Sequence, residues 1–64
     1  MKLSEAPLTT IKIGDIVTAN NGKTGKIIAI QEAFWEDDDN QIEILWANNK
    51  VTNEYQYEYD EVEI

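Results

Sequence analysis

Short runs of alternating apolar and polar residues, each ended by turn-forming residues, constrain the fold of this 64-residue chain most. The clearest run spans residues 41–47. Its side chains Ile42, Ile44 and Trp46 share one face of an extended strand, and we expect that face to be core. Nine isoleucines and three valines against three leucines add to this pattern, because β-branched side chains favour sheets over helices. The pattern therefore predicts an all-β fold.

Turn residues divide the chain into expected strands over 15–19, 26–34, 41–47 and 51–59, followed by a short turn and a closing strand within the tail 60–64. Asn20-Asn21-Gly22 and Asn48-Asn49-Lys50 are typical of tight hairpin turns, in which Asn and Gly tolerate positive φ. The doubly apolar run 27–30 indicates a central strand, 35–40 a loop, and 1–10 an extended lead-in. We expect residues 1–64 to form one domain, a small five-stranded barrel. Its predicted inner layer is Val17, Ile27, Ile44, Trp46 and Val62, with Ile64 also inward.

The chain contains no cysteine and no histidine. These absences exclude Ser-His and Cys-His triads, zinc fingers and thiol redox chemistry. A calcium loop after Asp37 would need a glycine where Ile42 stands, and Gly22-Lys23-Thr24-Gly25-Lys26 lies between two strands rather than opening a helix as a phosphate loop does. We therefore expect no enzyme activity, no cofactor and no metal.

The net charge of −8 is distributed unevenly. Four lysines and two acids in residues 1–31 give +2, whereas eleven acids and Lys50 in residues 32–64 give −10. Such a surface disfavours nucleic-acid binding, which depends on lysine and arginine, and favours a basic protein partner. Residues 1–10 have no continuous apolar run, so we expect a cytoplasmic protein without a signal peptide or membrane span.

Four segments together resemble the SH3-like barrel group: Gly14-Asp15-Ile16-Val17, Gly22-Lys23-Thr24-Gly25-Lys26-Ile27, Ile44-Leu45-Trp46 and Asp60-Glu61-Val62-Glu63-Ile64. Members of this group include KOW-type modules of the translation and transcription machinery, the small stromal photosystem I subunit and the variable chain of ferredoxin-thioredoxin reductase. The resemblance implies a small barrel. RNA-binding KOW modules usually carry basic loops, whereas the acidic residues 36–39 occupy a loop of this chain.

Aromatic and acidic side chains in the second half are the candidate partner-binding residues. In the loop after the central strand, a tryptophan beside carboxylates can stack on and neutralise an arginine or lysine. A lid over the open end of the barrel is the equally weighted alternative for Trp35. In the tyrosine stripe 55, 57 and 59, core packing is the default interpretation, and phenols at the rim are candidates for contact. The full candidate set is Phe34, Trp35, Glu36, Asp37, Asp38, Asp39, Tyr55 and Tyr57.

Three functions are compatible with these residues. The first is a non-enzymatic protein-binding module, or an accessory factor of a phage or bacterium, that engages the basic surface of a larger protein. The second is a nucleic-acid mimic, which needs carboxylates in two rows at roughly phosphate spacing, a need that strand positions such as Glu54 and Glu58 meet only in part. The third, which the net charge disfavours, is a KOW-type nucleic-acid module using Lys12, Lys23, Lys26 and Lys50.

Overall fold

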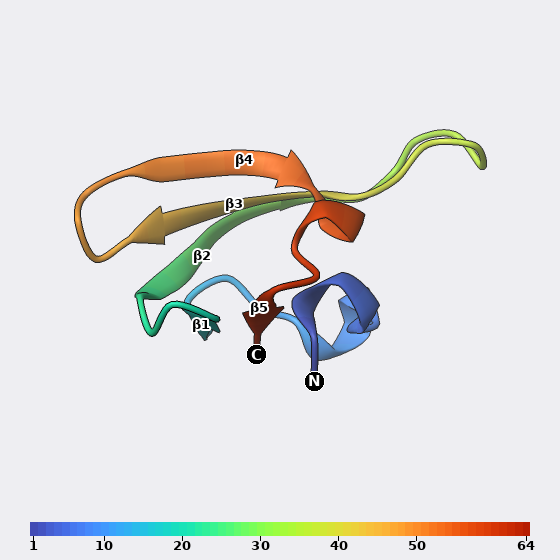
Figure 1. The fold of residues 1–64 in the computed structure, drawn as a ribbon. Helices are drawn as coiled ribbons and strands as arrows, with labels where there is room; N and C mark the ends of the chain where they lie inside the picture. The colour runs from blue at the N-terminus through green and yellow to red at the C-terminus, as the bar shows by residue number, and fades with distance from the viewer.

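The computed structural model describes residues 1–64 and confirms an all-β fold of five antiparallel strands. The strands form one sheet of order β4-β3-β2-β1-β5, curled into a half-barrel (Figure 1). The strand bounds are β1 Ile16–Ala19, β2 Thr24–Gln31, β3 Gln41–Trp46, β4 Val51–Tyr55 and β5 Val62–Glu63. β2 lies at the centre of this order, as its doubly apolar sequence predicts. No helix has the length and apolar character needed to cross a membrane.

The concave face of the sheet carries the core. Cross-strand pairs place Ile27 of β2 opposite Ile44 of β3, and Ile30 opposite Ile42. Four of the five predicted inner-layer residues are buried, namely Val17, Ile27, Ile44 and Val62. Trp46, the fifth residue predicted for the inner layer, differs from the prediction. Its indole is only half-buried and packs against the edge of the core. Ile64 is also partly buried against the core.

A β-bulge at Ile28 sets which side chains of β2 face inward. The register shifts between Ile27 and Ala29, so Ile28 has no partner on β3. Without the extra residue, strict alternation would turn Ile30 to the outer face. With it, Ile27 and Ile30 both pair with core residues of β3 although they are three residues apart. The bulge therefore explains how an unbroken apolar run supplies one buried face.

Residues 1–10, expected to be an extended lead-in, instead form two 3-10 turns, η1 over Leu3–Glu5 and η2 over Leu8–Thr10. Leu3 is fully buried and Ala6 nearly so, and both belong to the same core cluster as the strands. A backbone bridge between Lys2 and Glu63 holds this segment against β5. The segment therefore closes the side of the sheet that five short strands leave open.

Two expected strand boundaries are wrong at their C-terminal ends. β2 stops at Gln31 rather than Phe34, because the last pair of its ladder is Gln31 with Gln41. β4 stops at Tyr55 rather than Tyr59, and Gln56–Glu58 form a third 3-10 turn, η3. Both differences fall at one end of the sheet, where the candidate site is found.

Candidate functional site

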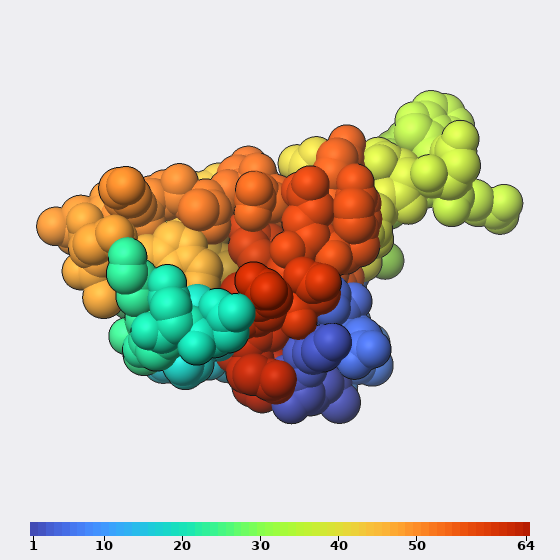
Figure 2. All heavy atoms as spheres, in the orientation of Figure 1, coloured from blue at the N-terminus to red at the C-terminus, as the bar shows by residue number.

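The connection between β2 and β3 forms an arm, which we define as residues 32–40. It extends away from the rest of the molecule as a narrow loop (Figures 1 and 2). Its sequence contains five acids and no lysine or arginine, which gives it a formal charge of −5. The cavity beneath it holds only about 40 Å³, enough for a single water molecule. The arm therefore offers a projecting surface rather than a pocket.

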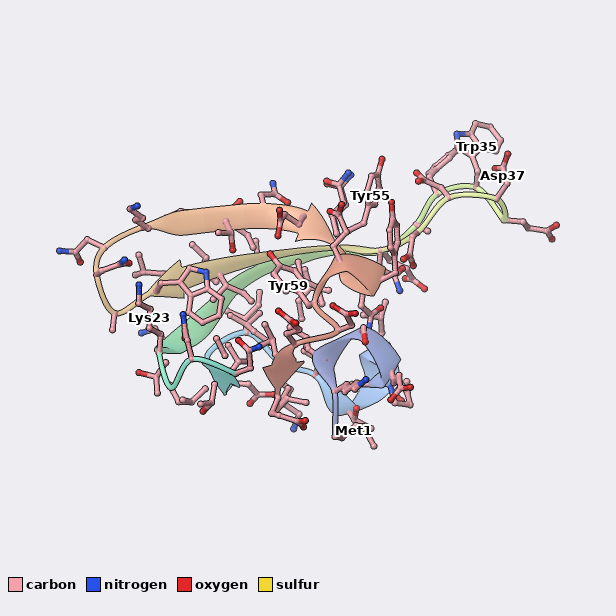
Figure 3. The ribbon with its side chains drawn as sticks, viewed as in Figure 1. Met1, Lys23, Trp35, Asp37, Tyr55 and Tyr59 are labelled. Carbon is pink, nitrogen blue, oxygen red and sulfur yellow. The ribbon has the colours of Figure 1, made fainter.

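Two aromatic rings lie at the tip of the arm. Phe34 is 84% exposed and Trp35 is 67% exposed. Their rings contact each other edge to face, with centroids 4.9 Å apart and an interplanar angle of 79°. Trp35 lies away from the sheet (Figure 3), so it does not form a lid over the barrel. Two large apolar rings held in water at the end of a projection are typical of a surface that a partner covers.

The four consecutive acids of the arm have two different roles. Side chains of Asp38 and Asp39 accept backbone hydrogen bonds from Asp39 and Asn40, both at 2.9 Å. Asp39 also accepts the backbone N–H of Tyr57 at 3.3 Å through its other carboxylate oxygen. Glu36 and Asp37 make no hydrogen bond or ion pair, and their carboxylates are exposed beside the aromatic tip. The carboxylates of Asp38 and Asp39 thus stabilise the backbone conformation of the arm, whereas those of Glu36 and Asp37 remain available to pair with a cation.

Asn40 closes the base of the arm. Its side-chain Oδ1 accepts the backbone N–H of Ala33 across the loop at 2.8 Å. Its Nδ2 donates to Gln56 Oε1 at 3.0 Å, and its backbone oxygen accepts the N–H of Gln56 at 2.7 Å. These bonds join both ends of the arm to the start of η3. The base of the arm is therefore fixed to the body of the protein, whereas the two aromatic rings at its tip contact only each other.

Gln56 is the one buried polar residue, and its amide is fully paired. Its Nε2 donates to the backbone oxygens of Leu3 and Ala6, at 2.9 and 2.7 Å. An expected strand over 51–59 with its tyrosines inward would place Gln56 on the outer side, but the structure buries this residue. The 3-10 turn rotates it inward, where it links the N-terminal segment to Asn40. No pattern in the neighbouring sequence predicts the burial of Gln56, because the residues whose backbone oxygens it bonds lie about fifty positions away.

The same 3-10 turn breaks the expected tyrosine stripe. Tyr59 is buried at 3% exposure, and its hydroxyl donates to Ile42 O at 2.8 Å and lies 3.1 Å from Thr52 Oγ1. Burial raises the pKa of the Tyr59 phenol, and the charge of Glu54 adds to that increase. Tyr57 is 60% exposed and stacks on Tyr55, with centroids 5.7 Å apart and ring planes 11° from parallel.

The predicted site residues fall into two groups at one end of the molecule. Phe34, Trp35 and the four acids 36–39 lie on the arm. Tyr55 lies near the base of the arm (Figure 3) and is stacked on Tyr57. The bond between Asp39 and the Tyr57 backbone joins the groups. Sequence reasoning missed Asn40 and Gln56, which position both groups without being exposed enough to form the contact surface.

Comparisons with protein-family models, curated proteins and solved structures found no significant match to this chain. The functional argument therefore depends on the geometry and charge of the site itself.

Proposed function

We propose that this protein is a small, non-enzymatic protein-binding module of the SH3-like group, acting in the cytoplasm as an accessory factor. Its arm places Phe34 and Trp35 in an apolar recess that is bordered by basic residues on a larger protein. The observation that carries the proposal is the exposure of these two rings at the tip of a projection whose charge is −5. The five-stranded half-barrel with short hairpins supports the group assignment.

The energetics favour the two rings as the anchor. Covering both would remove on the order of 300 Å² of apolar surface from water, worth about 7 kcal/mol before the costs of association and ordering. Exposed carboxylates contribute less to affinity, because water and salt screen them, but they orient the encounter and accelerate it. We therefore assign affinity mainly to Phe34 and Trp35, and partner choice to Glu36 and Asp37.

The distribution of acids supports a protein partner over nucleic-acid mimicry. A mimic needs carboxylates in a continuous ridge with phosphate-like spacing. Here Glu43 pairs with Asn53 on the outer face, whereas Glu54 pairs with Ile42 on the core-bearing face at the sheet edge. Acids are therefore spread over both faces and the arm. A scattered pattern of this kind raises solubility and steers encounters without copying a backbone.

Affinity capture from cells that naturally contain the protein tests the proposal. The bait is the wild-type chain, and three variants are compared with it at low and high salt. One variant removes the rings (Phe34→Ala with Trp35→Ala), and one removes the free arm charges (Glu36→Gln with Asp37→Asn). The matched control removes two acids elsewhere (Glu43→Gln with Glu61→Gln).

We expect one or a few basic proteins to be retained by the wild type and the control. The ring variant should lose them at every salt concentration. The charge variant should retain less of them than the wild type at low salt, and this difference should shrink above about 0.1 M salt, where the Debye length falls below about 10 Å. Retention of the same proteins by the ring variant would refute the assignment of the arm.

A further inference from the structure

The two hairpin turns at the end opposite the arm have the same conformation. In the first, Ala19 N–H donates to Lys23 O at 2.7 Å and Gly22 N–H to Ala19 O at 2.9 Å. In the second, Trp46 N–H donates to Lys50 O at 2.7 Å and Asn49 N–H to Trp46 O at 2.9 Å. The residue before each lysine has a positive φ, 86° at Gly22 and 66° at Asn49. Equivalent positions of the two turns therefore present equivalent side chains.

Each turn presents an asparagine and a lysine as hydrogen-bond donors. Asn21 Oδ1 accepts the backbone N–H of Lys23 at 3.0 Å, and Asn48 Oδ1 accepts that of Lys50 at 3.2 Å. With both amide oxygens occupied, the Nδ2 groups remain as donors. The Lys23 and Lys50 ammonium groups make no ion pair, because the single ion pair of the molecule joins Met1 and Glu63. Four exposed side chains, two asparagines and two lysines, can thus donate hydrogen bonds from these two turns.

A surface pocket of about 300 Å³, open to solvent and called the cavity below, lies between these turns, with Trp46 as its aromatic wall. The indole is fixed in place, since Nε1 donates to Thr52 Oγ1 at 2.9 Å and Thr52 in turn contacts the Tyr59 hydroxyl. Gly25 lies against the other side of the ring, where a Cβ atom would come within 2.9 Å of Trp46 Cε3. The half-burial of Trp46 is explained by this arrangement: one part of the ring packs on the core edge and another lines the cavity.

No acidic side chain lines the cavity, although the protein carries thirteen acids and five lysines. Two of those five lysines are at this one opening. The cavity lies at the end of the molecule marked by Lys23 in Figure 3, opposite Trp35 at the tip of the arm. Its charge is therefore complementary to an anion, in contrast to the rest of the surface.

We propose that this cavity binds a small ligand made of a flat ring and one anionic group. The ring packs against the Trp46 indole, and the anion lies between Lys23 and Lys50, where the amide groups of Asn21 and Asn48 also donate to it. The volume lies at the lower end of the range for ligand pockets and suits a mononucleotide or an aromatic acid. A phosphate and a carboxylate both match this donor set. The proposal is independent of the arm, which lies elsewhere on the molecule.

Two-dimensional NMR titration tests the proposal. The Trp35→Phe variant is used throughout, because it leaves Trp46 as the only tryptophan and gives one indole N–H resonance. The probes are adenosine 5′-monophosphate, phenylacetate, adenosine, inorganic phosphate and a short oligodeoxythymidine. Binding is then measured after Lys23→Gln with Lys50→Gln. The matched control, Lys2→Gln with Lys12→Gln, removes two positive charges that do not line the cavity.

We expect the Trp46 indole and the Lys23 and Lys50 amide resonances to shift saturably with adenosine monophosphate, phenylacetate or both. Whichever of these two probes binds more tightly identifies the preferred anionic group, which is phosphate for adenosine monophosphate and carboxylate for phenylacetate. The Lys23/Lys50 variant should bind roughly tenfold more weakly, and the control about as well as the parent. The proposal is overturned if neither small anion binds, if adenosine binds as tightly as its phosphate, if only the oligonucleotide binds, or if the Lys23/Lys50 variant keeps full affinity.

Discussion

Asn40 and Gln56 form two hydrogen bonds with each other, one between their side chains at 3.0 Å and one from Gln56 N–H to Asn40 O at 2.7 Å. Gln56 also holds Leu3 and Ala6 through its buried amide. One residue pair therefore connects the base of the arm to the N-terminal segment. The position of the arm depends on the core, whereas its aromatic tip is free of the core.

The first prediction concerns Gln56→Leu, which keeps the size of the side chain and removes its hydrogen bonds. The backbone oxygens of Leu3 and Ala6 would lose a donor in a buried place. We expect a loss of about 2–4 kcal/mol in the free energy of unfolding, measured by urea denaturation. Gln31→Leu, at an exposed strand position, is the control and should change stability by less than about 0.5 kcal/mol. Equal effects of the two substitutions would refute the role assigned to Gln56.

The second prediction concerns Gly25→Ala. A Cβ atom at this position would lie 2.7 Å from Ile44 Cγ2 and 2.9 Å from Trp46 Cε3, closer than side chains pack. We expect about 1–3 kcal/mol of destabilisation from overpacking. The exposed neighbour Thr24→Ala should cost no more than about 0.5 kcal/mol. An unchanged thermal midpoint for Gly25→Ala would mean that β2 and β3 approach less closely than described.

The third prediction is a loss of stability in alkali that depends on Tyr59. Burial raises the pKa of this phenol in the folded state, whereas in the unfolded chain it ionises near pH 10. Above about pH 10 the unfolded state gives up its proton first, so the free energy of unfolding falls as pH rises toward the folded-state pKa. Below pH 10 the phenol is protonated in both the folded and the unfolded state, so the stabilising contribution of Tyr59 is fully present there.

Tyr59→Phe should remove that alkaline loss, while lowering stability by about 1 kcal/mol at neutral pH because the hydroxyl contacts to Ile42 and Thr52 disappear. Thermal midpoints measured between neutral and strongly alkaline pH give the comparison. Tyr57→Phe, which removes an exposed phenol, should retain the wild-type profile. If the Tyr59→Phe profile is as steep as that of the wild type, the alkaline transition has another origin.

The fourth prediction is that the arm tip contributes nothing to folding. Phe34 and Trp35 contact each other and are exposed to water, so no core contact is lost when they are truncated. The double variant Phe34→Ala with Trp35→Ala should keep its free energy of unfolding within about 0.5 kcal/mol of the wild type. Urea denaturation checks this. A loss of 2 kcal/mol or more, as for a core aromatic, would show that the rings are packed on the protein itself.

Local periodicity predicts the strands of this protein better than it predicts their ends. Ile42 and Ile44 are buried as the alternation of β3 requires, and the two hairpin turns occur where Asn and Gly residues place them. The bulge at Ile28 cannot be recognised in an unbroken apolar run. Its position depends on which partners β3 offers, and that is a contact between strands rather than a property of β2.

The candidate site is predictable in part for the same reason. Aromatic residues beside acids can be recognised in the sequence, so Trp35 and Asp37 are candidates, although the sequence equally allows Trp35 to cover the barrel. Gln56 is missed, because its burial follows from hydrogen bonds to a segment at the other end of the chain. Those bonds favour a 3-10 turn over continued strand, and the change in periodicity buries Tyr59 while exposing Tyr57.

Site-specific photocrosslinking in the native cells tests the central claim most directly. A benzophenone amino acid is placed at position 35 in one version of the protein and at position 51 in another, since Val51 is also exposed but belongs to β4. We expect position 35 to give a discrete adduct with a larger basic protein, and position 51 to give none of that adduct. Absence of any adduct at position 35, or the same adduct at both positions, would contradict the assignment of the arm as the partner-binding surface.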